Sequence, residues 1–172
     1  MAATPRRLRA SRPMKTLYLV RHAKASRDDP SLADRDRPLN KRGLHDAPAM
    51  AKRLAKPAID LIVSSPALRA LTTAQLFADE LGHARPSIVI DERVYASTAN
   101  ALLVLIQELD DGIDGVMLFG HNPEFSELVG RLAGKAIDMP TCAVARLRFD
   151  VASWADVGPG ALERFTLDKP EH

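Results

Sequence analysis

Short apolar runs alternate with longer amphipathic stretches along this chain. Compact apolar runs predict buried strands over residues 15–20, 60–65, 87–90 and 115–120. Apolar residues at i, i+3 and i+4 spacing predict helices over residues 40–55, 66–82, 98–110 and 123–134. The last two segments, 142–150 and 161–167, alternate apolar and polar positions and predict a hairpin-like edge, with Trp154 packed in their connection.

Capping and breaking residues support several of these boundaries. Asn40 suits the N-cap of the first helix, Pro66 suits the first turn of the second, and Gly82 suits its end. Pro48 argues against an unbroken first helix, because proline in a helix interior costs about 3 kcal/mol. We therefore expect a kink at Pro48 or a helix that starts later. Residues 26–38 are polar, contain two prolines and predict a loop.

Strands that alternate with helices predict an α/β domain, a three-layer α/β/α sandwich with a mostly parallel central sheet. The chain has 172 residues, which suggests one domain, over residues 15–172. In such sheets ligands bind beyond the carboxyl ends of the strands. The residues that follow each strand are therefore the first place to search for a functional site.

The N-terminal segment differs from the rest in charge. Residues 1–15 contain five basic residues and no acid, and without these cations the net charge of +2 would become −3. We expect residues 1–14 to be a disordered basic tail, or Met14 to be the true start, in preference to an organelle transit peptide. The remaining body shows no basic stripe of the kind that binds nucleic acid.

The sequence also restricts the compartment. Cys142 is the one cysteine and cannot form an internal disulfide, which fits a reducing compartment, so we expect a cytoplasmic protein. No apolar run approaches the ~18 residues of a membrane span, and we expect no membrane association.

Three predicted strand ends are followed by side chains that can bind an anion or take part in a reaction. The first strand is followed by Arg21 and His22, the second by a helix whose first turn holds Arg69, and the fourth by His121. Any one of these residues has a structural explanation, but four of them on one predicted edge are harder to dismiss. Arginine forks match phosphate oxygens, and a helix N-terminus adds N–H donors for the same anion. A neutral imidazole is a competent nucleophile if its other nitrogen donates a hydrogen bond, and a second, protonated histidine would stabilise the transition state.

Rival sites fit less well. The chain lacks the HxH and HExxH spacings of metal sites, and paired guanidinium groups repel cations. It also lacks the G-x-S-x-G elbow of serine hydrolases and the phosphate loop of nucleotide-binding enzymes. These patterns favour an anion site over a metal site and make nucleotide-driven phosphotransfer a poor fit.

Three stretches, "LYLVRHAKAS", "SSPALRALTTA" and "GHNPEFSELV", resemble the signatures of the histidine phosphatase superfamily, whose fold is phosphoglycerate mutase-like. The Arg-His-Ala opening and "DDPSLADRDRPLNKRG" are most similar to the SixA-type phosphohistidine phosphatases. The resemblance covers about residue 15 to the C-terminus. It implies that His22 is the nucleophile, that Arg21, Arg69 and His121 bind the phosphoryl oxygens, and that no cofactor is needed.

Two positions qualify the resemblance. Mutase-type relatives use a glutamate as proton donor to the leaving group, and Glu92 in "DERVY" stands in a similar setting, although a surface carboxylate explains it equally well. Asp28 falls where relatives often have a polar residue near the phosphate, and we treat it as a candidate for the rim of the site. If Glu92 is not the acid, phosphoramidates become the favoured substrates, because a leaving nitrogen is readily protonated.

The sequence leaves three functions open. The first is a metal-independent phosphatase that forms a phosphohistidine intermediate and acts on phosphohistidine in a partner protein, such as a signalling protein. The second is a small-molecule phosphomonoesterase of the same superfamily, and the third is a non-catalytic phosphate-binding module. Four further cations border the expected mouth and would attract an acidic partner if they are not simply solvated: Arg35, Arg37, Lys41 and Arg42.

Overall fold

The structure, a computed structural model, describes residues 14–171 and contains one six-stranded sheet. The strands are β1 (Lys15–Arg21), β2 (Leu61–Ser64), β3 (Val89–Ile90), β4 (Gly115–Gly120), β5 (Val144–Phe149) and β6 (Leu162–Asp168). The sheet order is β3-β2-β4-β1-β5-β6. Apart from Met14, the basic tail expected over residues 1–14 lies outside the described residues.

The sheet is parallel over two thirds of its width. β1 pairs with β4, β4 with β2, and β2 with β3, all in parallel. β5 is antiparallel to β1, and β6 is antiparallel to β5 at the edge. This arrangement confirms the mostly parallel sheet and the antiparallel edge predicted from the sequence.

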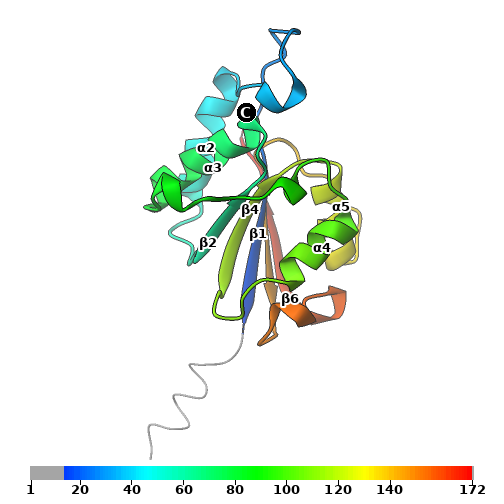
Figure 1. Cartoon of the computed structure of the whole chain (residues 1–172). Coiled ribbons are helices and arrows are strands. Elements are labelled where there is room, and N and C mark those ends of the chain that lie inside the picture. The colour runs from blue at the N-terminus through cyan, green and yellow to red at the C-terminus, as the bar shows by residue number, and fades with distance from the viewer. Residues whose placement is uncertain (1–13, 172) are drawn as a thin grey trace, which may run out of the picture.

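Four helices cover the two faces of the sheet. They are α2 (Lys41–Arg53), α3 (Leu68–Leu81), α4 (Ala99–Gln107) and α5 (Glu124–Ala133). α2 and α3 lie on one face, and α4 and α5 lie on the other (Figure 1). The three-layer α/β/α prediction is therefore confirmed. Within residues 14–171, no helix is long and apolar enough to cross a membrane.

β1 shows why an uninterrupted apolar run forms the centre of this fold. Leu17 and Leu19 pack into the cluster beneath α4 and α5, whereas Tyr18 and Val20 pack into the cluster beneath α2 and α3. Side chains alternate between the faces of a strand, so a strand covered on both sides needs apolar residues at every position. The run ends at Arg21, where the strand leaves the two helical layers.

The first helix does not start after Pro48, which was one of the two alternatives expected for this proline. The Asn40 side chain accepts a hydrogen bond from the Gly43 backbone N–H at 2.9 Å, so the helix begins at Lys41, as the cap predicts, and not later. It then continues through Pro48 to Arg53. Proline removes one helical hydrogen bond, but the buried face of α2, which includes Met50, compensates through packing against the sheet.

Two polar groups near the far end of the sheet are buried with partners. Lys15, counted with the basic segment above, lies in β1, and its Nζ donates to the Asp114 carboxylate at 2.8 Å and to the Asp111 carbonyl at 2.7 Å. Trp154 is fully buried, and its Nε1 donates to the Ile113 carbonyl at 2.7 Å. Lys15 is therefore a structural cation of the folded domain.

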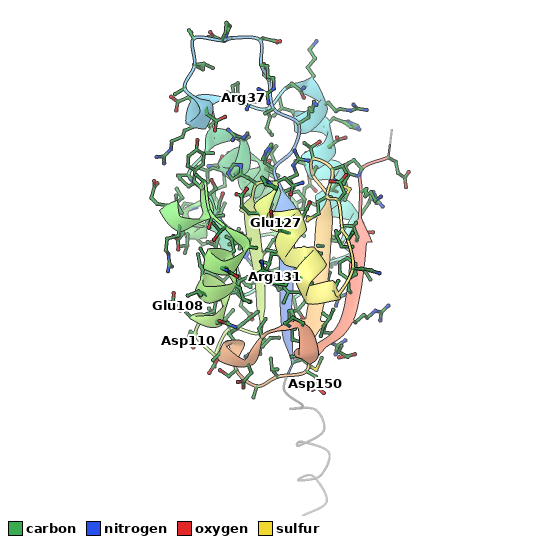
Figure 2. All side chains as sticks on the ribbon, turned by 90° about the vertical axis from the view of Figure 1, so that its right-hand side faces the viewer. Arg37, Glu108, Asp110, Glu127, Arg131 and Asp150 are labelled. Carbon is green, nitrogen blue, oxygen red and sulfur yellow. The ribbon has the colours of Figure 1, made fainter. Side chains whose placement is uncertain are left out.

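The carboxyl ends of β1, β2 and β4 meet at one edge of the sheet, and the loop over residues 26–38 stands beyond that edge (Figure 1). The loop contains a short 3₁₀ turn, Asp34–Asp36. In the view turned by 90°, Arg37 lies at this end of the molecule and Asp150 lies at the opposite end (Figure 2). The candidate residues predicted from the strand ends therefore share this edge.

Gly120 at the end of β4 provides a test of this packing. A Cβ atom at Gly120 would come within 2.5 Å of the Phe125 ring and within 3.0 Å of Val94. We expect Gly120→Ala to lower the free energy of unfolding by about 1–3 kcal/mol, measured by urea denaturation, because both neighbours are fully buried. Gly160→Ala, whose Cβ meets no atom within 4 Å, is the control and should leave stability nearly unchanged. Equal effects at the two positions would contradict this account.

Candidate active site

The end of β1 is held between its two neighbouring strands. The His22 backbone N–H donates to the Gly120 carbonyl at 3.0 Å, and the Arg21 N–H donates to the Ala143 carbonyl at 3.1 Å. Both residues therefore have a fixed backbone at the carboxyl end of a central strand of the sheet. His22 is buried, whereas Arg21 is partly exposed.

One of the two nitrogens of the His22 imidazole is hydrogen-bonded to the backbone. Its Nδ1 lies 2.8 Å from the Ala23 carbonyl oxygen, which can only accept, so Nδ1 carries the proton and donates. Nε2 then keeps its lone pair. Burial lowers the pKa of His22 to about 3, against the opposing effect of the Ala23 hydrogen bond, with smaller contributions from His121 and from the positive charges of Arg69 and Arg21. At neutral pH the ring is therefore uncharged, and the lone pair on Nε2 has the chemistry that a nucleophile requires.

Arg69 enters the site from the first turn of α3 and is buried. Its Nη1 donates to the Asp34 carbonyl at 2.7 Å, and its Nη2 donates to the Asp34 carboxylate at 2.9 Å. Thr73, one turn further along α3, donates to the Arg69 carbonyl at 2.7 Å and accepts from the Ala23 N–H at 3.0 Å. The threonine thus connects the helix that carries Arg69 to the segment that follows His22.

His121 follows β4 and lies beside His22, with their ring centroids 5.2 Å apart. Its Nε2 is 2.8 Å from the Ser65 hydroxyl, whose oxygen accepts from the Ala67 N–H at 3.2 Å and whose own proton can be donated to Nε2. Burial, followed by the charge of Arg69, lowers the pKa of His121 to about 4. The sequence suggested a protonated second histidine, but without substrate this ring is neutral. When the Ser65 hydroxyl donates to Nε2, the ring proton lies on Nδ1, which can donate to an anion.

Arg21 has unused hydrogen-bonding capacity. Its Nη1 donates to the Met139 carbonyl at 2.9 Å. Its Nε is buried and has no hydrogen-bond partner among residues 14–171. A buried donor without a partner is costly, and Arg21 is one of the residues that line the cavity described below.

Asp34 and Tyr95 form part of the site although the sequence reasoning assigned neither a role. The Tyr95 hydroxyl donates to the Asp34 carboxylate at 2.6 Å, and its ring lies edge-on to His121 at 5.6 Å. The Tyr95 hydrogen bond and, less strongly, Arg69 hold the pKa of Asp34 well below its usual range. A signal existed for Tyr95, the aromatic residue in "DERVY", but none for Asp34 in a polar loop.

These residues surround a cavity of about 380 Å³ at the sheet edge. It is lined by five cationic side chains, two carboxylates, both imidazoles and five uncharged residues. They are Arg21, His22, Lys24, Ala25, Arg27, Asp34, Arg37, Arg69, Tyr95, Ala96, His121, Asn122, Glu124 and Thr141. The structure thus brings together four of the five predicted site residues in a cationic cavity suited to an anion.

Glu92, the fifth candidate, does not line this cavity. Its carboxylate is exposed and accepts two hydrogen bonds from Arg35 Nη2, at 2.9 and 3.0 Å. Of the other expected rim residues, Arg37 lines the cavity, whereas Asp28, Lys41 and Arg42 line a separate shallow groove. In this geometry Glu92 is a surface ion-pair residue.

No group of three His, Cys, Asp or Glu side chains within residues 14–171 is arranged to hold a metal ion. The guanidinium groups of Arg69 and Arg21 act electrostatically on both histidines, and guanidinium groups attract anions. The chemistry of this set therefore fits phosphoryl binding by side chains of the chain itself.

Relatives of known sequence and structure share this architecture. Residues 17–95 match the model of the histidine phosphatase superfamily (branch 1). An uncharacterized chloroplastic protein of Arabidopsis thaliana is 34% identical over 169 residues, which cover 90% of this chain and 78% of that protein.

Two solved structures illustrate how far the likeness extends. A protein of Agrobacterium tumefaciens assigned as the phosphohistidine phosphatase SixA is 31% identical, with a TM-score of 0.71 over 78% of this chain and 91% of its own. A protein of Escherichia coli assigned as an alpha-ribazole-5′-phosphate phosphatase shares the fold at 14% identity, with a TM-score of 0.65 over 92% of this chain and 96% of its own. The chain therefore belongs to the histidine phosphatase superfamily, and its likeness to SixA supports membership of the SixA-type branch.

Proposed function

We propose that this phosphatase transfers the phosphoryl group of its substrate to Nε2 of His22, without a metal ion, and that its substrate is phosphohistidine in a partner protein such as a signalling protein. The observation that carries the proposal is the buried, neutral His22, with Nδ1 bonded to the Ala23 carbonyl and Nε2 available. Arg21, Arg69 and His121 line the same cavity and supply donors for the phosphoryl oxygens.

The reaction has two steps. In the first, Nε2 of His22 forms a bond to phosphorus while the bond to the leaving group breaks, and the leaving nitrogen takes up a proton from solvent. In the second, water attacks the phosphohistidine, releases phosphate and restores neutral His22. The guanidinium groups of Arg21 and Arg69 stabilise the charge that spreads over the equatorial oxygens in both transition states.

The position of Glu92 supports a P–N substrate. An alkyl phosphate needs a protein acid to protonate its leaving oxygen, whereas a leaving nitrogen is readily protonated by solvent. The carboxylates that line the cavity are Asp34, which is held ionised by its partners, and Glu124 in the first turn of α5. Asp34 is therefore a poor proton donor and Glu92 stands outside the cavity, so of the described carboxylates that line the cavity Glu124 remains as a candidate acid for an alkyl phosphate.

A substrate panel in excess chelator tests the proposal. We expect hydrolysis of p-nitrophenyl phosphate, phosphoramidate and a phosphohistidine peptide to continue in EDTA, with the peptide giving the highest kcat/KM. A requirement for added metal would refute the metal-independent mechanism. Faster turnover of sugar phosphates than of either P–N substrate would instead favour a small-molecule phosphomonoesterase, and phosphate binding without turnover would favour a binding module.

The variant Glu92→Gln tests whether the Glu92 carboxylate is a proton donor to the leaving group or a surface ion-pair residue. We expect kcat/KM to change less than about threefold on both phosphoramidate and an alkyl phosphate, because an exposed, ion-paired charge outside the cavity perturbs a site weakly. Glu108→Gln is a matched control, since Glu108 is also exposed and paired with an arginine, Arg93. A selective loss on the alkyl phosphate in Glu92→Gln alone would make Glu92 the general acid.

The two active-site histidines should titrate far below the ordinary range. Because their pKa values are lowered to about 3 and about 4, we expect the His22 and His121 rings to stay neutral as pH falls from 8 to 5. The unfolded chain takes up these protons near pH 6.5, so stability should decline as pH falls from 6.5 toward 4. Nitrogen-15 NMR of the substrate-free protein measures both the charge and the Nδ1–H tautomer of His22. Protonation of either ring near pH 6.5 would contradict the burial argument.

A further inference from the structure

The cavity carries more cations than the phosphoryl site uses. Besides Arg21 and Arg69, it is lined by Lys24, Arg27 and Arg37. Arg37 is engaged, because its Nε donates to the Ser26 carbonyl at 3.1 Å and its Nη1 to the Asp34 carboxylate at 3.3 Å. The side chains of Lys24 and Arg27, in contrast, are exposed and make no hydrogen bond or ion pair with any of residues 14–171. Two cations at the mouth are therefore available to a ligand.

The backbone that carries them is anchored. Ala25 forms an isolated antiparallel bridge with Leu39, and the Lys24 carbonyl accepts from the Asn40 N–H at 3.0 Å. α2 also approaches closely, since a Cβ atom at Gly43 would lie 2.3 Å from the Lys24 carbonyl oxygen. The side chains of Lys24 and Arg27 thus start from a segment that is pinned directly after His22.

The charges of the cavity do not balance with a single phosphoryl group. The lining includes five cations and two carboxylates, and both imidazoles are neutral without substrate, so the net charge is +3. A phosphoryl dianion offsets two of these charges and leaves one positive charge. A volume of about 380 Å³ is in the range of sites for whole small ligands and has room for a second group.

We propose that Lys24 and Arg27 form a second anion subsite, and that the substrate carries a further anionic group, a carboxylate or a second phosphate, beside the phosphoryl group that His22 takes. The proposal rests on the proposed function in one respect only, namely that the phosphoryl group binds at Arg21 and Arg69. It holds for an acidic phosphoprotein and for a small substrate with two anionic groups, which share this chemistry.

Non-hydrolysable phosphonates test the subsite by calorimetry, independently of catalysis. Ethylphosphonate carries one anionic group, 3-phosphonopropionate adds a carboxylate, and methylenebisphosphonate adds a second phosphonate. We expect the wild-type protein at low ionic strength to bind one or both of the latter about tenfold more tightly than ethylphosphonate, since two exposed ion pairs are gained. The one that gains more indicates whether a carboxylate or a second phosphate is the natural partner.

The double variant Lys24→Gln/Arg27→Gln should lose this preference. Lys41→Gln/Arg42→Gln is the matched control. It also removes one lysine charge and one arginine charge, but from the start of α2, where neither residue lines the cavity. A preference that survives in the first variant, or that falls equally in both, would refute a local subsite, as would equal affinity of the wild type for all three phosphonates. Failure of the phosphohistidine peptide as a substrate would refute the proposed function while leaving this binding result intact.

Discussion

His22→Asn should reduce kcat/KM for p-nitrophenyl phosphate and for phosphoramidate by at least ~10⁴-fold, because loss of a covalent nucleophile removes the whole reaction path. Asparagine retains an amide donor near the position of Nδ1, so the hydrogen bond to the Ala23 carbonyl can persist while Nε2 is lost. The rates are measured with excess EDTA. A residual rate within tenfold of the wild type would show that another group attacks phosphorus.

The same variant tests the intermediate. Rapid mixing with radiolabelled substrate, followed by an alkaline quench, should trap a phosphoenzyme in the wild type that is labile to acid, as phosphohistidine is. The label should be absent in His22→Asn and present in His45→Asn, in which an exposed histidine of α2 outside the cavity is replaced. Label that remains in His22→Asn would show that another residue is the nucleophile.

Much of the edge that carries this chemistry could be predicted because its signals are local. Arg21 and His22 end a run that is apolar at every position, which only a strand covered on both faces requires. Arg69 and His121 follow two more such runs, and parallel strands bring their carboxyl ends to one edge. Sequence therefore predicted both the sheet and the convergence of four side chains.

The loop over residues 26–38 had no comparable signal. Its residues are almost all exposed, and its position depends on long-range contacts such as that of Asp34 with Arg69 and Tyr95, residues 35 and 61 positions away. Glu92 shows that an unpredicted loop contact can also make a sequence motif misleading. Its motif suggested a catalytic acid, but the side chain turns to Arg35, a partner supplied by this loop. Contacts between a polar loop and a distant turn leave no periodic pattern in sequence.

Arg69 provides the second large expected effect. We expect Arg69→Ala to lower kcat/KM by about 10²–10³-fold, the usual cost of removing one donor to a developing oxyanion, with Arg69→Lys intermediate. Lysine keeps the charge but lacks the planar fork that matches two phosphoryl oxygens. Arg85→Ala is the matched control, because Arg85 makes a comparable two-bond pair with Asp79 at an exposed site outside the cavity. Steady-state kinetics on phosphoramidate measures all three.

Arg69 also holds Asp34, so its loss could act through the loop instead of through the phosphoryl group. Asp34→Ala separates these routes, since it removes the carboxylate that Nη2 contacts and leaves the guanidinium in the cavity, where Nη1 can still donate to the backbone carbonyl of residue 34. If Arg69 binds the phosphoryl oxygens, Asp34→Ala should cost much less than Arg69→Ala, because the carboxylate no longer competes with the anion for Nη2. Equal losses in the two variants would mean that Arg69 acts by positioning residues 26–38, and the phosphoryl site would then consist of Arg21, His22 and His121.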